Sequence, residues 1–374
     1  MTLRDLISPE QRREFLEKLK KIHLNNIGKT LMDKNDPIHC ENLIGGTILP
    51  MGVAGPLKIL NFKFQISIYY IPLATTEGAL VASVNRGCKA INFSGGTTTA
   101  VELVGTTRGP VFETAGIKES LKFRDWLDNN FSFLKKGAEK TSSHIKLMKL
   151  GTRTNGRYVY VRFYFDTSKA MGMNMVTIAT QKIVETIEKA AKIKCLSLAG
   201  NFDIDKKPTW LNFIFGRGRR VWAEAIIPEK IVNEVLKTTP SRLYDVWLAK
   251  CLIGSAMSGS LGFNAHYTNV IAAFFAATGQ DLAHVVEGSL GMTTTKILEN
   301  GNLYISVYLP DVMIGIVGGG TKLIIKKEAL SIIGAKSSSE LAEVLAGAVL
   351  AGEISLLASL AEGSLAKTHD RLGR

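Results

Sequence analysis

The stretch from about Pro110 to Leu198 differs in character from the sequence on either side of it. A lysine-rich helical segment is followed by the strand RYVYVRFYF, whose Val and Phe residues share one face, and then by a helix opened by Ser168. The flanking sequence instead carries runs of small residues, such as GSAMSGSLGFNAH and LAGAVLAGE, which allow helices to pack closely. A chain of 374 residues is also long enough for two domains of about 150 residues each. The sequence therefore predicts two domains, with an α+β unit inserted into a larger one.

Local patterns predict several elements around this insert. Because glycine and proline are frequent in ENLIGGTILPMGVAGPL, we expect residues 41–57 to form a folded loop rather than a strand. An alternating strand is expected at residues 64–68, followed by a helix that Thr75 or Thr76 can cap. The charged residues 1–40 are expected to form a separate helical segment.

Charge and cysteine content narrow the class of protein. The chain has 46 lysine and arginine residues against 33 acidic residues, a net charge of +13, which favours anionic partners. These charges form no long tail or aromatic-interleaved run, so small anionic molecules are favoured over nucleic acid. The four cysteines form no C-x-x-C and no histidine pair, so we predict no metal site, no disulfide framework and a reducing cytoplasm. The charged N-terminus and the glutamate inside the longest apolar run predict no membrane segment.

Candidate catalytic residues are isolated polar side chains in glycine-rich or small-residue surroundings. The G-x-G-x-x-G, P-loop and G-x-S-x-G motifs are all absent from the sequence. Glu77, in ATTEGAL, suits a general acid if it is desolvated, although a glutamate at a helix start can simply complement the helix dipole. Lys206, in DIDKKP, can place its ammonium on a developing oxyanion, or it can be a solvated lysine on a surface turn.

Two more candidates lie nearer the C-terminus. Asp281 follows an apolar helical run in AATGQDLAHVV, so we expect a carboxylate near the core with a cationic partner that keeps it ionised. His369 is one of six histidines and can donate a proton to a leaving group, although a histidine near a chain end is often only exposed to solvent. Composition alone does not join these residues with Glu77 and Lys206 into one site.

The segment SKAMGMNMVTIATQKIVETI predicts a helix with a core face at Met173, Val176, Ile183 and Ile187. Its N-terminal amides, beside a methionine-rich surface, can hold a flat anionic ligand. A helix packed on both faces is the alternative that the pattern leaves open.

Taken together, these segments resemble the 3-hydroxy-3-methylglutaryl-CoA reductase family. The resemblance is carried, in family order from about Glu41 to His369, by ENLIGGTILPMGVAGPL, PLATTEGALVASVNRGCKAI, TTRGPVF, AMGMNM, DKKP, GSAMSGS, GFNAH, TGQD, VGGGT and LAGE. It implies an α+β fold. A large, mostly helical domain that binds the CoA substrate would comprise residues 41–110 and 198–374, and an inserted ferredoxin-like NADP-binding domain would comprise residues 111–197.

The resemblance also implies an activity. A soluble, cytoplasmic enzyme of archaeal type would reduce 3-hydroxy-3-methylglutaryl-CoA to mevalonate and CoA with two NADPH, in isoprenoid biosynthesis. Active sites in the family are shared between subunits, which implies a homodimer or homotetramer. Neither nucleic acid nor a membrane is implied as a partner.

Residue by residue, the family motifs assign catalysis to Glu77, Lys206, Asp281 and His369. Lys206 would stabilise the oxyanion, Glu77 would protonate the aldehyde oxygen, Asp281 would link the two, and His369 would protonate the departing thiolate. The matches to substrate-binding positions are Arg108, Asn201, Lys207, Lys250, His266 and Asn269. The matches to the cofactor segment are Lys169, Met171, Gly172, Met173 and Asn174.

Several positions depart from the family pattern. Lys169 stands where an aspartate is usual, Ala199 replaces a serine, and Asp203 adds a negative charge at a neutral position. Val104 replaces an acidic residue, and Ser364 replaces a histidine. These departures leave a second hypothesis open, a relative that binds CoA or nucleotide with little turnover. A nucleic-acid-binding protein, a third hypothesis, depends on the net charge alone.

Overall fold

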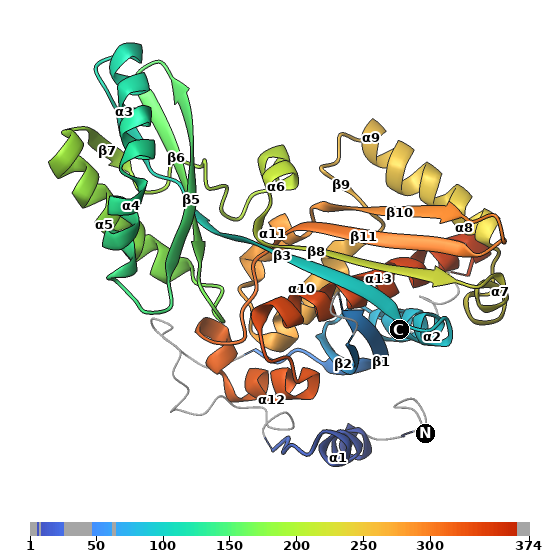
Figure 1. The fold of residues 1–374 in the computed structure, drawn as a ribbon. Helices are drawn as coiled ribbons and strands as arrows, with labels where there is room; N and C mark the ends of the chain where they lie inside the picture. The colour runs from blue at the N-terminus through green and yellow to red at the C-terminus, as the bar shows by residue number, and fades with distance from the viewer. Residues whose placement is uncertain (1–5, 7–8, 26–46, 62–64, 365–374) are drawn as a thin grey trace.

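The computed structural model describes residues 6, 9–25, 47–61 and 65–364 of the chain (Figure 1). The helices and strands, in chain order, are α1 (Pro9–Lys20), β1 (Met51–Asn61), β2 (Ile66–Ala74), α2 (Leu80–Phe93), β3 (Thr97–Arg108), β4 (Val111–Glu113), α3 (Ile117–Asn129), α4 (Phe131–Glu139), β5 (Lys146–Asn155), β6 (Tyr158–Asp166), α5 (Met173–Ala191), β7 (Lys194–Ser197), α6 (Trp210–Phe215), β8 (Arg217–Ile227), α7 (Glu229–Leu236), α8 (Pro240–Trp247), the π-helix η2 (Leu248–Gly254), α9 (Ser255–Met257), β9 (Gly262–Phe263), α10 (Tyr267–Thr278), η3 (Leu282–His284), α11 (Val285–Gly288), β10 (Gly291–Ile297), β11 (Leu303–Val312), η4 (Gly319–Lys322), α12 (Ile324–Ile333) and α13 (Ser338–Glu362).

The strands form one continuous mixed sheet, in the order β7-β4-β6-β3-β8-β11-β10-β9, with β5 beside β6 and β1 and β2 attached through β3. Most pairs are antiparallel, whereas β1 runs parallel to β3 and β9 runs parallel to β10. Strand β3 connects the two ends of the sheet, because Thr98–Gly105 pair with β8 and Thr106–Arg108 pair with β6. The prediction of an α+β chain is therefore confirmed.

Two large hydrophobic cores lie on either side of this connection. The smaller core joins β5 and β6 to α3, α4 and α5, at the upper left of Figure 1. The larger core surrounds α13, which packs against α2, α10 and strands β3, β8 and β11. The prediction that the larger domain is mostly helical is incomplete, because seven described strands outside residues 111–197 provide its framework.

The alternating strand of the smaller core forms as predicted. Val159, Val161, Phe163 and Phe165 of β6 are all completely buried. Val176, Ile183 and Ile187 of α5 are also buried and pack in the same core. The period-2 and period-3.6 patterns identified these two elements because each presents one apolar face to a single core.

Three local predictions were wrong. Residues 51–57 belong to strand β1 rather than to a loop, because a bulge between Ala54 and Leu57 accommodates Gly55 and Pro56 without ending the pairing with β2. Helix α2 begins after Ala79 without a side-chain cap, and Thr75 instead accepts a hydrogen bond from the Glu77 amide.

The third wrong prediction concerns the start of α5. This helix begins after Gly172, and not at Ser168, because Gly172 adopts a left-handed φ of 90°. A β-carbon on Gly172 would lie 2.4 Å from the Thr167 side chain, so the turn accepts only glycine. The helix N-terminus is therefore four residues further along the chain than the sequence pattern suggested.

Small residues bring the long helices into close contact, as their distribution predicted. A β-carbon added to Gly87 of α2 would lie 1.9 Å from the backbone oxygen of Ala351 in α13. By length and composition alone, α13 is apolar enough to cross a membrane, but 89% of its most apolar window is buried inside the molecule. Helix α13 is thus the central core helix of the larger part.

Candidate active site

The loop between β7 and α6 carries Lys206 in an unusual backbone conformation. Asn201, Ile204 and Lys206 all have left-handed φ angles, of 59°, 50° and 58°. Such angles are costly for residues with a β-carbon and persist only where the surroundings enforce them. Here Thr107 donates a hydrogen bond to the Asp203 carbonyl at 2.8 Å, and Asn212 donates one to the Ile204 carbonyl at 3.0 Å. Strand β3, through Thr107, and helix α6, through Asn212, thus fix the shape of the loop.

Lys206 of this loop forms an ion pair with Asp281, which follows helix α10. The Lys206 Nζ lies 2.7 Å from Asp281 Oδ2, and both side chains are more than a third exposed. Asp281 Oδ1 also accepts a hydrogen bond from the Ala283 amide at 3.0 Å. Burial raises the pKa of the Asp281 carboxyl, but the hydrogen bonds from Lys206 and Ala283 outweigh it and leave the pKa below its ordinary value. The carboxylate is therefore ionised and paired, as its position after an apolar helix predicted.

A buried charge network lies beneath this ion pair. The Arg217 side chain, at the start of β8, is completely buried and binds Asp205 at 2.8 Å and Glu287. Burial by itself lowers the pKa of the guanidinium, but the nearby Asp311, Glu287 and Asp205 carboxyls raise it above its ordinary value. Arg217 therefore anchors the residue that directly precedes Lys206 to the core of the sheet.

Glu77 lies against a different segment. Asn269, in the first turn of α10, donates a hydrogen bond from Nδ2 to Glu77 Oε1 at 3.1 Å. The start of α10 is held in turn by Glu353 of α13, which accepts hydrogen bonds from the Ala265 and His266 amides and from Thr293. A cavity of about 360 Å³ lies beside Glu77 and Thr75. Glu77 is thus positioned by the N-terminal end of α10.

Within one chain, the ion pair and Glu77 lie at opposite ends of α10. Asn269 is in the first turn of this 12-residue helix, and Asp281 follows its last residue by three positions. At 1.5 Å per residue the helix spans about 18 Å. The structure therefore brings Lys206 together with Asp281, and Glu77 together with Asn269, but not the two pairs with each other.

Arg108 is already engaged by this chain's own acidic residues. Its NH1 lies 3.2 Å from Asp203 Oδ2 and 3.9 Å from Asp205 Oδ2, and its NH2 donates a hydrogen bond to Thr177 at 2.7 Å. The Asp203 side chain is buried, whereas 16% of the Arg108 side chain remains exposed. The acidic residue that departs from the family pattern thus neutralises a candidate binding arginine.

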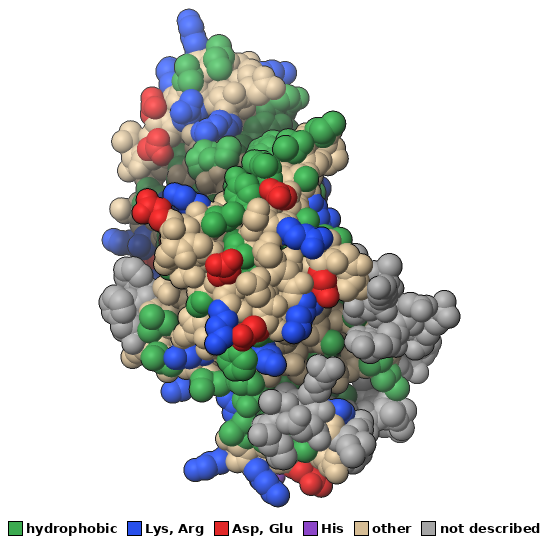
Figure 2. Space-filling view, turned by 90° about the vertical axis from the view of Figure 1, so that its right-hand side faces the viewer, with side chains coloured by type: hydrophobic (Ala, Val, Ile, Leu, Met, Phe, Trp, Pro, Cys, Tyr) green, Lys and Arg blue, Asp and Glu red, His purple; other side chains and the backbone are tan. Residues whose placement is uncertain are grey.

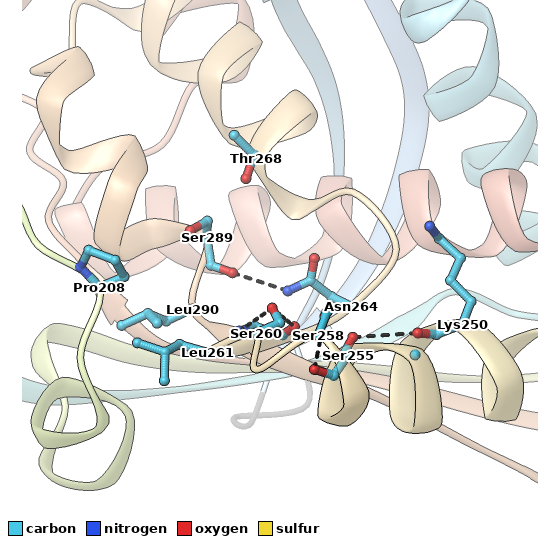
Figure 3. A pocket seen from close by; sticks show the side chains of 12 residues that line it. Pro208, Lys250, Ser255, Ser258, Ser260, Leu261, Asn264, Thr268, Ser289 and Leu290 are labelled. Atoms are coloured by element: carbon cyan, nitrogen blue, oxygen red, sulfur yellow. Dashed lines mark hydrogen bonds between the residues drawn. The ribbon is translucent and has the colours of Figure 1, made fainter.

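A cavity of about 530 Å³ lies between the Lys206 loop and the GSAMSGS segment (Figure 3). Lys250 stands at one side of it and Pro208 at the other, with Asn264 and Ser289 joined by a hydrogen bond between them. Lys250 belongs to the π-helix η2, a distortion that is frequent at functional sites. The lining is mostly hydroxyl, amide and ammonium groups, which suits a polar, negatively charged ligand.

The other predicted binding residues are placed as follows. Lys207 is exposed and donates a hydrogen bond to the Asp205 carbonyl at 3.3 Å. Asn201 is exposed on the same loop. The buried Nε2 of His266 has no hydrogen-bond partner among the described residues. His369 lies outside the described residues.

The predicted cofactor segment leads into α5. Lys169 and Asn174 are exposed, whereas Met171, Gly172 and Met173 are half-buried. The segment is braced by Thr106, which donates to the Met171 carbonyl at 2.8 Å, and by Ile316, which donates to the Lys169 carbonyl at 2.9 Å. No side chain caps α5, so its first amides remain available to a ligand.

Among the described residues, one group has the composition of a metal site: Asp205, His284 and Glu287. The Arg217 guanidinium binds both carboxylates of this group. Because a cation already occupies the position between them, the group is a buried ion-pair network rather than a metal centre.

Sequence reasoning missed the residues of this network and the role of Glu353. A signal was present, since Asp281, His284 and Glu287 recur at three-residue spacing in DLAHVVE, and Glu353 interrupts an apolar helix. A buried charge requires a partner, so each of these positions predicted a polar contact in the core.

Comparisons with known proteins identify the family of the chain. Residues 8–374 match the family described as hydroxymethylglutaryl-coenzyme A reductase. The 3-hydroxy-3-methylglutaryl-coenzyme A reductase of Methanocaldococcus jannaschii is 48% identical over 98% of this chain and 93% of its own. The enzyme of that name from Pyrococcus abyssi is 46% identical over the same shares of the two chains.

A solved structure has a similar fold. It is that of the class II 3-hydroxy-3-methylglutaryl-CoA reductase from Streptococcus pneumoniae bound to NADPH in open conformations. It superposes with a TM-score of 0.73 at 19% identity, over 96% of this chain and 94% of that one. Together with the match over nearly the whole sequence, these similarities establish that the chain belongs to the hydroxymethylglutaryl-coenzyme A reductase family.

Proposed function

We propose that Glu77, Lys206, Asp281 and His369 catalyse the reaction of this family in the present chain. The chain is an oxidoreductase that reduces 3-hydroxy-3-methylglutaryl-CoA to mevalonate and CoA with two NADPH, in the mevalonate pathway of isoprenoid biosynthesis. Two hydrides and two protons convert the thioester to a primary alcohol and a free thiol. The ion pair of Lys206 and Asp281, held on a strained loop, is the observation that best supports the assignment.

Each residue would act at the oxygen or sulfur where charge develops. The Lys206 ammonium would stabilise the oxyanion formed from the thioester carbonyl, and later that of mevaldehyde. Glu77 would donate the proton that the second oxyanion needs. His369 would protonate the departing thiolate. The thiolate is a stronger base than imidazole, because an unperturbed thiol has a pKa near 8.5 and an unperturbed histidine one near 6.5. Asp281 would hold the lysine charged and oriented until substrate arrives.

The binding residues would divide the substrate between them. Lys250 and the polar cavity of Figure 3 offer a cationic site for the free carboxylate, together with Lys207 and Arg108. Asn201, His266 and Asn269 would line the same site, and the buried Nε2 of His266, which lacks a partner among the described residues, is available to a ligand.

The residues before α5 fit the nucleotide. Lys169 supplies an exposed positive charge, and the uncapped amides of Met173 and Asn174 face an anion favourably. Gly172 permits the tight turn, and Met171 is fixed through its backbone. When bound, NADPH supplies the hydride.

We assign residues 111–197 as the inserted NADP-binding domain, between the two parts of the CoA-binding domain, 41–110 and 198–374. The strand order β7-β4-β6-β5, with α3 and α4 between β4 and β5 and α5 between β6 and β7, supports a ferredoxin-like topology. The assignment of residues 1–40 as a helical segment is supported over α1.

A homodimer or homotetramer is supported by an apolar face around α6 and β8. Trp210, Ile214 and Phe215 of α6 and Trp222 and Ile226 of β8 are all more than a third exposed. Large apolar side chains exposed on two successive elements are typical of an interface. A second copy of this chain would cover it.

A cytoplasmic location is supported by the burial of α13, the described helix that is long and apolar enough to span a membrane. On the face in Figure 2, lysine and arginine side chains are interspersed with aspartate and glutamate. A continuous basic stripe, which nucleic-acid binding would favour, is absent from that face.

The contact between Arg108 and Asp203 is expected to weaken substrate binding. Replacing Asp203 with asparagine should lower KM for 3-hydroxy-3-methylglutaryl-CoA by about threefold to tenfold, because the substrate carboxylate no longer competes with a buried aspartate for the guanidinium. Steady-state kinetics at fixed NADPH measure this effect. Glu113→Gln, which removes the exposed Arg157 pair, is the matched control. An increase in KM with Asp203→Asn would mean that the pair orients Arg108 for binding.

Turnover itself tests the proposed function. The purified chain should oxidise NADPH on addition of 3-hydroxy-3-methylglutaryl-CoA and release one free thiol for every two NADPH consumed. The fall in absorbance of the reduced nicotinamide measures NADPH consumption, and a thiol reagent measures the free CoA released. Thioester binding without consumption of NADPH or NADH would instead support the relative with little turnover, which the substitutions at positions 169, 199 and 203 suggest.

A further inference from the structure

His284 lies directly behind the proposed catalytic pair and is completely buried. Its Nδ1 lies 2.7 Å from Glu287 Oε1, and its Nε2 lies 3.7 Å from Asp281 Oδ2 and 4.0 Å from Asp205 Oδ1. That Nε2 has no hydrogen-bond partner among the described residues. A buried polar atom without a partner, aimed at two carboxylates, requires an explanation.

The surrounding charges determine which ring nitrogen changes its protonation. The titratable and charged groups near His284 are Asp281 and Glu287 from its own turn, Asp205 and Lys206 from the loop, Arg217 from β8 and Asp311 from β11. Glu287 Oε1 accepts from Arg217, so its carboxylate is an acceptor and Nδ1 must donate to it. The Nε2 is then the position that gains or loses a proton.

The same carboxylate oxygen faces both cations. Asp281 Oδ2 binds the Lys206 ammonium at 2.7 Å and lies 3.7 Å from His284 Nε2. A shift of less than 1 Å would bring Nε2 within hydrogen-bond distance of that oxygen. A proton on Nε2 therefore competes with Lys206 for Asp281 and loosens the lysine from its partner.

We propose that His284 is a positioning residue that, when protonated, releases Lys206 from Asp281 so that the ammonium can move onto the substrate oxyanion. This inference rests on the proposed function, because it assumes that Lys206 stabilises the oxyanion. Because its side chain is completely buried, His284 would act through Asp281 rather than by contact with substrate or cofactor. With His284 neutral, Lys206 is the one cation on Asp281 Oδ2 and stays bound to it. The hydride step is therefore faster in the protonated state.

Mevaldehyde reduction by NADPH removes His369 from the pH dependence and leaves Glu77, the proton donor, and His284. No thiol leaves in that step, so His369 has no leaving group to protonate. The experiment measures kcat and KM for mevaldehyde from pH 5 to 8.5 in the parent, His284→Gln, Glu287→Gln and His144→Gln. His144 is an exposed histidine of the smaller part and serves as the matched control.

In the parent we expect kcat to fall as pH rises and Nε2 of His284 loses its proton. His284→Gln should reduce that fall to the part that Glu77 causes and lower kcat at pH 5 to 6 by about tenfold, with KM changed less than about twofold, since misplacing one catalytic group can cost up to a hundredfold. Glu287→Gln should move the fall to lower pH, because the imidazolium loses a carboxylate that favours its charged form. His144→Gln should behave as the parent.

A folded His284→Gln variant that keeps the parent's pH dependence overturns the proposal, and so does a parent rate that is flat across the range. Thermal unfolding and NADPH binding verify that each variant is folded. If His284→Gln fails to fold, the direction of the shift in Glu287→Gln decides, and no shift or a shift to higher pH overturns the proposal. Lys206→Ala, measured in parallel, distinguishes failure of the proposed function from failure of this inference. If Lys206→Ala still reduces mevaldehyde, the proposed function is refuted. If Lys206→Ala is inactive but His284→Gln keeps the pH profile of the parent, only this inference is refuted.

Discussion

Replacing Lys206 with alanine is expected to lower kcat for 3-hydroxy-3-methylglutaryl-CoA by about a hundredfold to a thousandfold. Removing one preorganised donor from a developing oxyanion has an effect of this size, and Lys206 would act at both hydride steps. The variant also leaves Asp281 without the ammonium that lies 2.7 Å from its Oδ2. KM should change little, because the lysine's main contact would form only as charge develops.

A matched control distinguishes the loss of the Lys206 ammonium from the effect of placing alanine at a left-handed φ. Lys237 is an exposed lysine at the end of α7 with a φ of 60°, close to the 58° of Lys206. Lys237→Ala therefore imposes the same backbone change outside the site and should retain the parent kcat. NADPH oxidation under saturating substrate measures both variants. A Lys206→Ala enzyme within fivefold of the parent would contradict the oxyanion role.

Elements with a single buried face could be predicted from the sequence, because periodicity records burial. Strand β6 and helix α5 are such elements, and both form where their apolar residues alternate or recur. Strand β1 could not be predicted, because its glycine and proline indicate a turn unless the bulge opposite β2 is known. The same limit applies to the start of α5, which depends on contact between Gly172 and Thr167.

Some contacts of the candidate site could also be predicted from the sequence, and others could not. The requirement that Asp281 have a cationic partner follows from the sequence, and its partner is Lys206. The sequence could not predict that Arg108 is occupied by Asp203, because their contact joins residues 95 positions apart. Nor could it predict Arg217 as the anchor of the Lys206 loop, since four segments meet at its guanidinium. Long-range polar contacts depend on the assembled fold rather than on local pattern.

Two inactive variants are expected to restore activity when they assemble together. Glu77 and the pair of Lys206 and Asp281 lie at opposite ends of α10 in one chain, about 18 Å apart along the helix. We therefore expect a site that needs all three residues to take Glu77 from one subunit and Lys206 from another, across a twofold interface. Glu77→Gln and Lys206→Ala should each be inactive alone.

Coexpression of these two variants with different affinity tags gives mixed dimers with one site that carries both substitutions and one that carries neither. Random assortment in equal amounts should recover about a quarter of the parent turnover, because half of the dimers are mixed and half of their sites are intact. Dimers purified through both tags should have about half the parent kcat. NADPH oxidation per subunit measures the recovery.

The control for this experiment pairs Lys206→Ala with Asp281→Asn. These two residues are in contact within one chain, so every site of their mixed dimer carries one substitution and should stay inactive. Recovery in the first pairing but not in the second would place Glu77 across the interface from Lys206. Failure of both pairings, in dimers shown to be mixed, would mean that each chain closes its own site, with Glu77 moving toward Lys206 when substrate binds.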